Sequence, residues 1–270
     1  MATQAHGRVL IIAGSDSGGG AGIQADIKAV TALGGYAMTA ITALTAQNTE
    51  GVHDVLPVPA AFLRRQIGVV VDDIGVDAIK TGMLHDADTI DCVVRLMQEA
   101  GAGVPLVVDP VMVAQSGASL LDPGAVGAMV ERLLPHATLL TPNLPEAEAL
   151  LGRAVPGEAG MEAAARELQA MTGGAVLLKG GHLQGDALLD VLVGPDGRTR
   201  RFHHARIHTR HTHGTGCTLA SAIATGIAQG FPLDHAVARA RDYLLEAIRT
   251  APGLGAGDGP VNHCHTVRSS

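Results

Sequence analysis

The chain has 270 residues, of which 47% are hydrophobic and 17% charged, and this composition excludes a disordered protein. Its net charge of -7 and its lack of tryptophan argue against nucleic-acid binding, which uses basic surfaces and aromatic stacking. No apolar run reaches the roughly 18 residues of a membrane span, and three widely spaced cysteines indicate a reducing compartment, so we expect a cytoplasmic protein that binds no membrane.

Short apolar runs alternate with longer amphipathic segments along the chain. The apolar runs are rich in β-branched residues and end at Gly, Asp, Thr or Pro, which predicts buried strands at 8–14, 37–44, 77–82, 105–112, 137–143 and 175–181. The segments between them predict helices at 22–33, 60–72, 86–100, 122–134, 145–151 and 160–171. This alternation predicts an α/β fold of three αβα layers, with a mostly parallel central sheet and helices on both faces.

The pattern changes near 188–208, where two alternating runs flank Gly-Pro-Asp-Gly and predict an edge hairpin. Two more helices are expected at 216–229 and 232–249. The glycine-rich segment that follows predicts a flexible tail over about 251–270. Because we find neither a repeat nor a linker, we expect a single domain over 1–270.

Polar side chains follow the predicted strands. In chain order they are Asp16, Gln47, Lys80, Thr81, Asp109, Asn143, Glu146 and Lys179. In a doubly wound sheet ligands bind outside the carboxyl ends of the strands, so these side chains predict a single cleft. Carboxylates, an amide, lysines and an anion-binding helix start suit a phosphorylated ligand with a divalent cation.

The first glycine-rich loop, "GSDSGGGAG" (14–22), carries Asp16 toward this cleft. Asp16 either faces a polar substrate or caps an ordinary βα turn. The loop is neither a Walker A loop nor a dinucleotide fingerprint. Gln47, in "TAQNT", pairs a donor with an acceptor and so matches an aminopyrimidine edge, or it bonds the loop backbone.

Asn143 and Glu146 are three residues apart at a predicted helix start. They form either a capping box or a nucleotide site in which Glu146, directly or through water, holds Mg²⁺. Lys179 is a candidate phosphate contact, with a structural ion pair as the alternative. The 13 histidines lack the spacing of zinc sites, so we expect no zinc.

A second glycine-rich loop, "HGTGCTLASAIATG" (213–226), leads into a predicted helix and carries Cys217. Loops of this kind hold an anion on their backbone N–H groups. We therefore expect an anion site here, with Cys217 either reactive or a packing residue.

The segments "AGSDSGGGAGIQADIKAVTALGGYAMTAITALTAQNT", "IKTGML", "VVDPVM", "TPNLPEAEAL", "LLKGGH" and "THGTGCTLASAIA" occur in this order over nearly the whole chain. Together they resemble the hydroxymethylpyrimidine/phosphomethylpyrimidine kinases of thiamin biosynthesis, in the ribokinase-like superfamily. The resemblance implies phosphorylation of 4-amino-5-hydroxymethyl-2-methylpyrimidine with ATP and Mg²⁺, and then of its monophosphate to the diphosphate. By analogy it also implies a homodimer.

The resemblance also assigns roles to individual residues. Gln47 would bond the pyrimidine edge, Asp16 would lie near the hydroxymethyl arm, and the ring pocket would be lined by Gly14, Met83 and Val111. The anion hole would be formed by the backbone N–H groups of Gly214, Thr215, Gly216 and Cys217. ATP phosphates and Mg²⁺ would be served by Lys179, Asn143 and Glu146. The sequence departs from the family pattern at Gly18, where Ser is more common, and at His211, where Asn is common.

A charge argument explains Cys217, at a position where sugar kinases of this fold have an aspartate base. A phosphate monoester has a second pKa of about 6 and is already a nucleophile at neutral pH. A carboxylate would repel it, whereas a neutral thiol would not. We expect the helix N-terminus to lower the pKa of Cys217 enough for it to accept a proton.

Three other functions compete with this interpretation. A pyridoxal or pyridoxine kinase is the nearest, since its ligand is also a flat ring with a hydroxymethyl arm. A non-catalytic pyrimidine-binding protein would not need Lys179, Glu146 and the intact glycine loop. A sugar kinase is disfavoured by Cys217.

Overall fold

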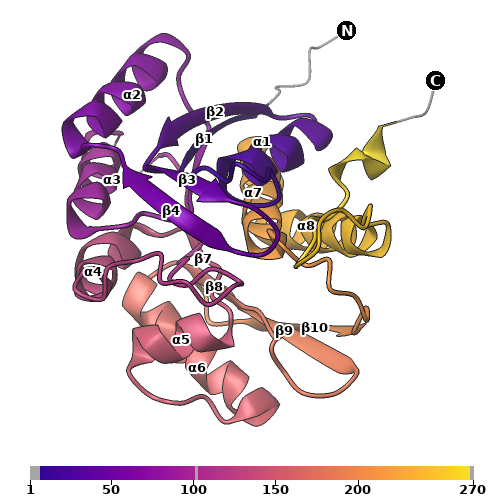
Figure 1. Cartoon of the computed structure of the whole chain (residues 1–270). Coiled ribbons are helices and arrows are strands. Elements are labelled where there is room, and N and C mark those ends of the chain that lie inside the picture. The colour runs from indigo at the N-terminus through magenta and orange to yellow at the C-terminus, as the bar shows by residue number, and fades with distance from the viewer. Residues whose placement is uncertain (1–6, 101–102, 268–270) are drawn as a thin grey trace, which may run out of the picture.

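The structure, a computed structural model, describes residues 7–100 and 103–267 and is built on an eight-stranded sheet (Figure 1). The strand order is β10-β9-β8-β7-β6-β5-β1-β2. Its strands are β1 (Arg8–Ala13), β2 (Tyr36–Ile41), β5 (Ala78–Thr81), β6 (Leu106–Val108), β7 (Leu139–Leu140), β8 (Ala175–Leu178), β9 (Ala187–Val193) and β10 (Thr199–Ala205). Strands β1, β2 and β5 to β8 pair in parallel, whereas β9 and β10 are antiparallel at the edge. The predicted mostly parallel sheet and its edge hairpin are confirmed.

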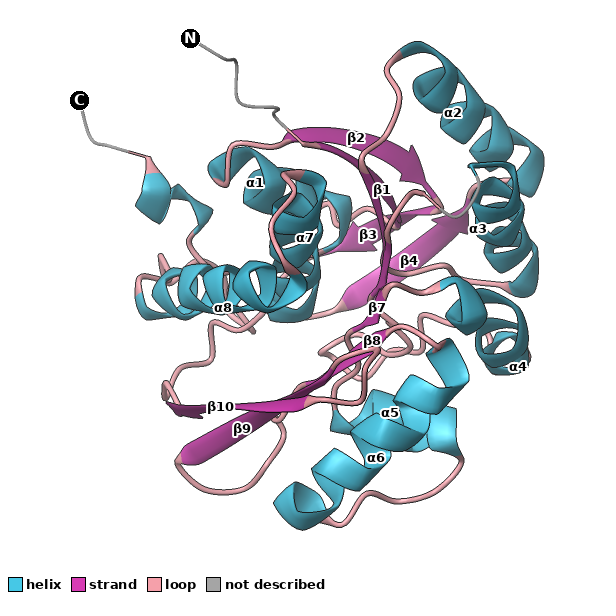
Figure 2. Cartoon of the chain, turned by 180° about the vertical axis from the view of Figure 1, so that it is seen from behind, coloured by secondary structure: helices cyan, strands magenta, loops and turns pink. Residues whose placement is uncertain are grey.

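Helices cover both faces of this sheet (Figure 2). One face carries α1 (Gly22–Ala32), α7 (Thr215–Ala228) and α8 (Leu233–Arg249). The other carries α2 (Ala60–Asp73), α3 (Ala87–Ala100), α4 (Ala125–Ala128), α5 (Leu144–Leu151) and α6 (Gly157–Thr172). Among the described residues, no helix combines the length and apolarity needed to traverse a bilayer.

The helix predicted at 122–134 is only partly formed. The structure has the four-residue α4, a π-helical turn over Met129–Leu133 and a 3-10 turn over Leu134–His136. Pro135 has no N–H to donate, so the α-helical hydrogen-bond ladder does not continue through it.

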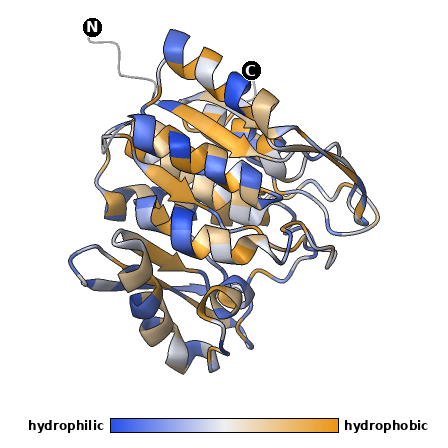
Figure 3. Cartoon of the chain, turned by 90° about the vertical axis from the view of Figure 1, so that its left-hand side faces the viewer, coloured by the Kyte–Doolittle hydropathy of each residue, from blue (hydrophilic) through white to orange (hydrophobic). Residues whose placement is uncertain are grey.

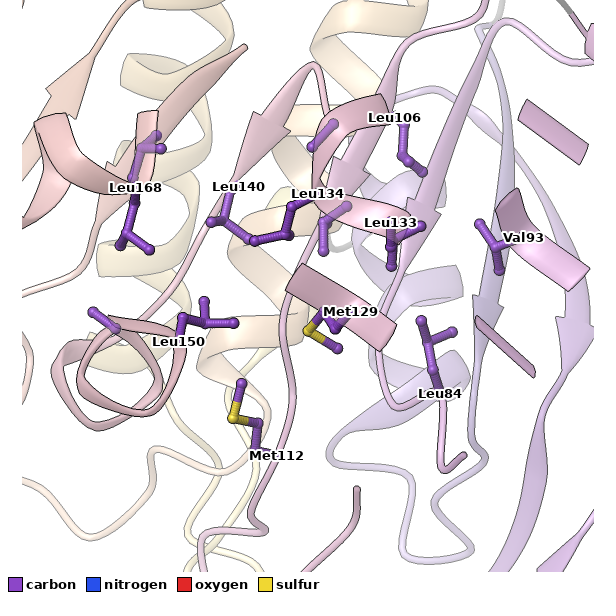
Figure 4. Close-up of a cluster of buried hydrophobic side chains, with 14 of the residues drawn as sticks. Leu84, Val93, Leu106, Met112, Met129, Leu133, Leu134, Leu140, Leu150 and Leu168 are labelled. Carbon is purple, nitrogen blue, oxygen red and sulfur yellow. The ribbon is translucent and has the colours of Figure 1, made fainter. Parts of the chain in front are cut away.

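Alternate residues of β1 enter two separate cores. Val9 and Ile11 pack with α1, α7 and α8, while Leu10 and Ile12 pack with the helices of the other face. Figure 4 shows part of this second core, and Figure 3 shows apolar strands beneath helices with polar outer surfaces. Because both faces of the strands are buried, their sequences are apolar throughout rather than alternating.

The strand predicted at 37–44 is wrong at its C-terminal end. The parallel strand β2 stops at Ile41, and β3 (Ala43–Gln47) pairs antiparallel with β4 (Val52–Pro57) in a separate two-stranded sheet. Asn48 closes the turn between them, since its Oδ1 accepts hydrogen bonds from the backbone N–H groups of residues 50 and 51. The ribbon lies outside the main sheet (Figure 1) and carries Gln47 at the end of β3.

The segment after α8 makes specific contacts, although its composition predicts a flexible tail. Asp258 N–H donates to the Thr49 carbonyl at 2.8 Å, and His213 N–H donates to the Gly259 carbonyl at 3.1 Å. A short helix, η3 (His263–Thr266), follows. The motion of this segment remains a prediction, but its contacts show where it lies.

Candidate active site

A cleft of about 850 Å³ runs along the carboxyl ends of the parallel strands. It is lined by every residue to which the sequence analysis assigned a role in binding or catalysis. These are Gly14, Asp16, Gln47, Met83, Val111, Asn143, Glu146, Lys179, Gly214, Thr215, Gly216 and Cys217. The fold therefore brings together residues from distant parts of the chain, as expected for ligand sites of doubly wound sheets.

Asp16 is almost completely buried in the loop between β1 and α1. Its carboxylate accepts hydrogen bonds from the N–H groups of Gly18, Gly20 and Ala21 at 2.7–2.9 Å, and Oδ2 lies 2.9 Å from Nε2 of His213. Burial alone would raise the pKa of Asp16, but the bonds from His213 and from the backbone outweigh it and lower that pKa. This geometry favours the capping alternative, and a contact with the hydroxymethyl arm stays a prediction.

Gln47 reaches the same histidine from β3. Its Nε2 lies 3.3 Å from His213 Nε2, and its Oε1 lies 3.3 Å from Thr45 Oγ1. The backbone N–H of Gln47 donates to Ser17 Oγ at 2.8 Å, and Ser17 Oγ donates back to the Gln47 carbonyl at 2.7 Å. The ribbon is thereby fastened to the Asp16 loop, with the half-buried amide in the cleft.

Two apolar side chains line the cleft beside this amide. Met83 is buried, and a Cβ at Gly14 would lie 2.9 Å from its sulfur, so a larger residue at 14 would displace it. Val111 follows β6, where its N–H donates to the Asp109 carbonyl at 2.8 Å. These residues form an apolar wall of the kind that binds a flat ring.

Helix α7 begins at the glycine-rich loop, with Gly214 as N-cap at φ +78°. The Thr215 N–H donates to the Thr212 carbonyl at 3.2 Å, so this group is already engaged. The N–H groups of Gly216 and Cys217 belong to the first helical turn, where no intrahelical acceptor exists and the helix dipole is positive. This arrangement suits an anion, and we call residues 214–217 the anion loop.

Burial, rather than the helix N-terminus, decides the ionisation of Cys217. It raises the pKa of this thiol to about 12; the nearby Lys80 opposes the rise, while Asp26 and Asp109 add to it. The expectation that the helix lowers this pKa is wrong, because the desolvation cost of the thiolate exceeds the local helix effect. Cys217 is a neutral thiol at neutral pH.

A cluster of charges lies beside the anion loop. Lys179 Nζ is 3.1 Å from Asp109 Oδ1 and 3.9 Å from Glu146 Oε2, and a Cβ at Gly216 would lie 3.3 Å from that ammonium. Burial would lower the pKa of Lys179, but Asp109 and Glu146 raise it above its ordinary value. The ion-pair alternative for Lys179 is thus present in the structure, and contact with a phosphate remains a prediction.

The capping box at the start of α5 is also formed. Asn143 Oδ1 accepts from the Glu146 N–H at 2.9 Å, and Glu146 Oε2 accepts from the Asn143 N–H at 2.7 Å. Burial raises the pKa of Glu146 to about 7, with Lys179 opposing and Asp109 adding to the rise. Capping uses one oxygen of Glu146 and leaves the other for a ligand.

Asp109 has an unsatisfied oxygen that fits a metal ion. Its Oδ2 is buried and has no hydrogen-bond partner among the described residues, while Oδ1 is 3.2 Å from Thr141 Oγ1. An unpaired buried carboxylate oxygen is costly unless a cation or donor reaches it. Carboxylate oxygens are the protein ligands that Mg²⁺ prefers, so Asp109 and Glu146 fit this ion. No group of three or more His, Cys, Asp or Glu suited to a metal occurs in the described ranges.

The far end of the cleft is apolar. Its wall is formed by Leu188, Ile207, Leu244, Leu245 and Ile248. Asp190 and Arg241 form a buried ion pair between β9 and α8 at this end. The cleft therefore has an amide-bearing end, an anion loop with charged neighbours, and an apolar end.

The sequence alone assigned no role to two functional candidates, His213 and Asp109, and did not predict a buried ion pair. His213 was part of a quoted motif but received no role, and no local pattern signals its contact with Asp16. For Asp109 the signal was its position as a carboxylate at the end of a predicted strand. Lys80, noted in the same way, pairs instead with Asp26 beneath the site.

This architecture and cleft define an α/β kinase of the ribokinase-like fold. A solved structure of the pyridoxal kinase from Staphylococcus aureus in complex with AMP-PCP and pyridoxal superposes with a TM-score of 0.87, at 34% identity over 97% of this chain and 95% of that one. The family model for phosphomethylpyrimidine kinase matches residues 16–262. The chain belongs to the phosphomethylpyrimidine kinase family.

Two relatives show how far the similarity extends. The hydroxymethylpyrimidine/phosphomethylpyrimidine kinase of Streptomyces coelicolor is 48% identical over 94% of this chain and 93% of its own length. The thiamine biosynthesis bifunctional protein ThiED of Geobacter sulfurreducens is 54% identical over 96% of this chain. The chain spans 52% of that bifunctional relative and so corresponds to about half of it.

Proposed function

We propose that the chain transfers a phosphoryl group from ATP to the hydroxymethyl group of 4-amino-5-hydroxymethyl-2-methylpyrimidine, and then a second one to the resulting monophosphate. The two reactions supply the pyrimidine diphosphate for thiamine biosynthesis. One observation carries this proposal: the cleft pairs an amide-bearing ring site with an anion loop whose one ionisable side chain, Cys217, is a neutral thiol. Such a loop accepts both an alcohol and an anionic phosphate.

The amide end holds the ring in this proposal. Gln47 offers one acceptor and one donor to the aminopyrimidine edge, and Met83 and Val111 pack against the ring. Asp16 holds the surrounding loop through its backbone bonds. The ring arm then points toward the first turn of α7.

Phosphoryl transfer needs positioning and charge stabilisation more than covalent chemistry by the protein. The N–H groups of Gly214, Gly216 and Cys217 are the donors for the transferring group, with the Lys179 ammonium beside them. Thr215 contributes less, since its N–H is engaged with Thr212.

Proton handling differs between the two steps. The alcohol must lose a proton as it is phosphorylated, but the neutral Cys217 thiol already holds its own proton and cannot take it, so the proton passes to a phosphate oxygen or to water. The monophosphate is already ionised and needs no base, and the neutral thiol does not repel it. Cysteine at this position therefore repels neither nucleophile.

The other end of the cleft takes ATP. The apolar wall that includes Leu244 and Ile248 suits an adenine ring, and Lys179 with the α5 N-terminus lies where phosphates would follow. Asp109 and Glu146 would hold Mg²⁺, which supplies charge neutralisation of the phosphates when bound. ADP and AMP-PCP complexes of the pyridoxal kinase relatives support a nucleotide here.

A second candidate is phosphorylation of pyridoxal in the same cleft. The observation that favours it is the superposition with pyridoxal kinases that are about a third identical to this chain. Both rings carry a hydroxymethyl arm, so the anion loop does not distinguish them, whereas Gln47 and a second phosphorylation do.

An ATP-consumption assay with four acceptors tests the proposal: hydroxymethylpyrimidine, its monophosphate, pyridoxal and ribose. We expect two ATP consumed per hydroxymethylpyrimidine, at most one per pyridoxal, and none with ribose. If product analysis at long incubation with excess enzyme finds only the pyrimidine monophosphate, the two-step reaction is excluded.

We further propose that the enzyme is a cytoplasmic homodimer. The dimer rests on analogy with the family, and the location rests on the spacing of the three cysteines. Light scattering of the purified protein measures the first, and cell fractionation the second.

A further inference from the structure

Residues 254–262, which we call the C-terminal clasp, pack beside the amide end of the cleft, where Asp258 lines a small hollow together with Gln47 and His213. Asp258 N–H donates to the Thr49 carbonyl at 2.8 Å, and Gly257 N–H donates to Thr49 Oγ1 at 3.3 Å. On its other side, His213 N–H donates to the Gly259 carbonyl at 3.1 Å. The clasp thus joins the turn that follows Gln47 to the residue that precedes the anion loop.

Glycine is required for these approaches. A Cβ at Gly257 would overlap the Thr49 carbonyl oxygen, and a Cβ at Gly259 would overlap the ring of His211. Thr49 and His211 thus lie so close to the backbone of the clasp that no side chain fits between them. The glycines that suggested a flexible tail are therefore also the residues that permit close packing.

The clasp is anchored at its C-terminal end. Val261 is buried, and Asn262 N–H donates to the Ala247 carbonyl of α8 at 2.9 Å. His263, also buried, has its Nδ1 3.0 Å from the Tyr243 hydroxyl. Near the other end, Arg210 Nη1 donates to the Ala256 carbonyl at 2.9 Å. Because the clasp is held at both ends, it can fix the positions of the residues that it contacts, Thr49 and His213.

His213 in turn orients the side-chain amide of Gln47. The Asp16 carboxylate has a lowered pKa and is ionised, so the hydrogen on His213 Nε2 points at it. The amide of Gln47 is then turned over: its carbonyl oxygen takes the position of Nε2, 3.3 Å from His213 Nε2, because an NH₂ there would oppose another donor.

Thr45 agrees with this orientation. Its Oγ1 donates to the Ser15 carbonyl at 2.9 Å and so is free to accept from the NH₂ of Gln47. The histidine and the threonine together determine which end of the amide faces which way. That orientation decides whether the ring edge meets its donor and acceptor in the right order.

We propose that the C-terminal clasp is a positioning element for ring recognition, which acts on Gln47 through Thr49 and His213. This inference rests on the proposed function, since it assumes that Gln47 reads the ring. It predicts a defect in ring binding that leaves nucleotide binding intact, because the clasp meets α8 at Ala247, which does not line the cleft, and its other contacts are at the amide end.

Gly257→Ala tests the clasp, with Gly127→Ala as the matched control, because a Cβ at Gly127 meets no atom within 4 Å. Calorimetric titration measures the Kd of hydroxymethylpyrimidine and of ADP for the full-length protein. We expect Gly257→Ala to weaken pyrimidine binding about tenfold or more while the Kd of ADP changes less than about twofold. Equal losses for both ligands, or none for the pyrimidine, would overturn the proposal.

A double-mutant cycle with Gln47→Ala separates positioning from general damage. If the clasp acts through Gln47, Gly257→Ala changes pyrimidine binding less than about twofold once Gln47 is absent. An undiminished effect in that background would show that the clasp acts elsewhere.

Should Gly257→Ala fold poorly, Arg210→Ala removes a clasp contact at an exposed side chain, and we expect a smaller effect with the same selectivity. Wild-type protein is measured first, because its failure to phosphorylate the pyrimidine would count against the proposed function. The clasp is tested by the Kd of the variant divided by the Kd of the wild type, measured with the ring ligand that the wild type binds. This ratio does not depend on which ring the enzyme phosphorylates.

Discussion

The Lys80 ammonium lies 2.9 Å from the Asp26 carboxylate, and both side chains are completely buried. Ser221, one turn after Cys217 on α7, donates its hydroxyl to the same carboxylate at 2.7 Å. The pair thus connects β5, α1 and α7 directly beneath the anion loop. Burial would lower the pKa of Lys80, but Asp26 and its neighbours raise it above its ordinary value, so the lysine stays charged.

Replacing Asp26 by Asn should destabilise the protein strongly. It leaves the Lys80 charge buried without a counter-ion, and breaking a buried pair in this way costs about 3–5 kcal/mol. Chemical denaturation measures the loss. Asp91→Asn, which breaks the exposed pair with Arg132, is the control and should cost within about 1 kcal/mol. Equal effects in the two variants would mean that the buried pair contributes little.

Gln47→Leu should weaken pyrimidine binding far more than ATP binding. An unpaired donor or acceptor in a closed site costs about 1–3 kcal/mol, which corresponds to a Kd roughly 5–150 times higher. Equilibrium titration with each ligand measures this difference, and Gln98→Leu on the exposed surface of α3 is the control. A uniform loss would show that Gln47 is structural.

Cys217 should react slowly with thiol reagents. Because burial raises the pKa of Cys217 to about 12, almost none of it is thiolate at pH 8, and the thiolate is the reactive form. Iodoacetamide at pH 8 should therefore label the exposed Cys264 first, as peptide mass spectrometry will show. Preferential labelling of Cys217 would mean that its pKa is lowered after all.

Cys217→Asp should separate the two phosphorylations. A carboxylate at the loop accepts the proton of the alcohol, so the first step should be kept or partly retained, whereas its charge repels the monophosphate and should slow the second. Cys217→Ala removes a neutral thiol that accepts no proton, so it should change the two steps alike, and by much less than the factor of about 10²–10⁴ that a proton-transferring base contributes. Steady-state rates with each acceptor measure both. If Asp leaves the second step as fast as in the wild type, the charge argument for cysteine at this position is wrong.

Glu146 should make the protein less stable as pH rises toward neutrality. Burial raises the folded-state pKa of Glu146 from 4.5 to about 7, so between these values the folded protein holds a proton that the unfolded chain has lost. Its contribution to stability is complete below pH 4.5 and disappears by about pH 7. Urea unfolding at pH 5 and pH 8 measures the decline.

Glu146→Gln is the matched comparison for this effect, since glutamine also completes a capping box. The decline in stability from pH 5 to pH 8 should be smaller in Glu146→Gln than in the wild type. An identical decline in both would show that the carboxyl group titrates normally.

Much of this architecture was determined by local sequence. Apolar runs such as 8–14, followed by glycine-rich loops, are enough to predict buried parallel strands, because both faces of each strand are covered. The strand-end positions of Asp16, Lys179 and Glu146 then predict one cleft, since parallel strands end at the same edge. The break after Ile41 was missed because the β3–β4 ribbon is short and lies outside the main sheet.

Only the tertiary structure decided which of these groups interact. Asp16 meets His213 across 197 positions and Lys179 meets Asp109 across 70, distances over which no spacing pattern carries information. The same holds for the glycines of the clasp, whose composition suggests mobility while their contacts with Thr49 and His211 require close packing. For Cys217 the local helix start indicated a lowered pKa, whereas burial by the whole fold raised it. The same physical reason applies to the long-range pairs, to the clasp glycines and to Cys217. Periodicity and hydrogen bonding within one helix or strand depend on local sequence, whereas desolvation and contacts between distant residues exist only once the chain has folded.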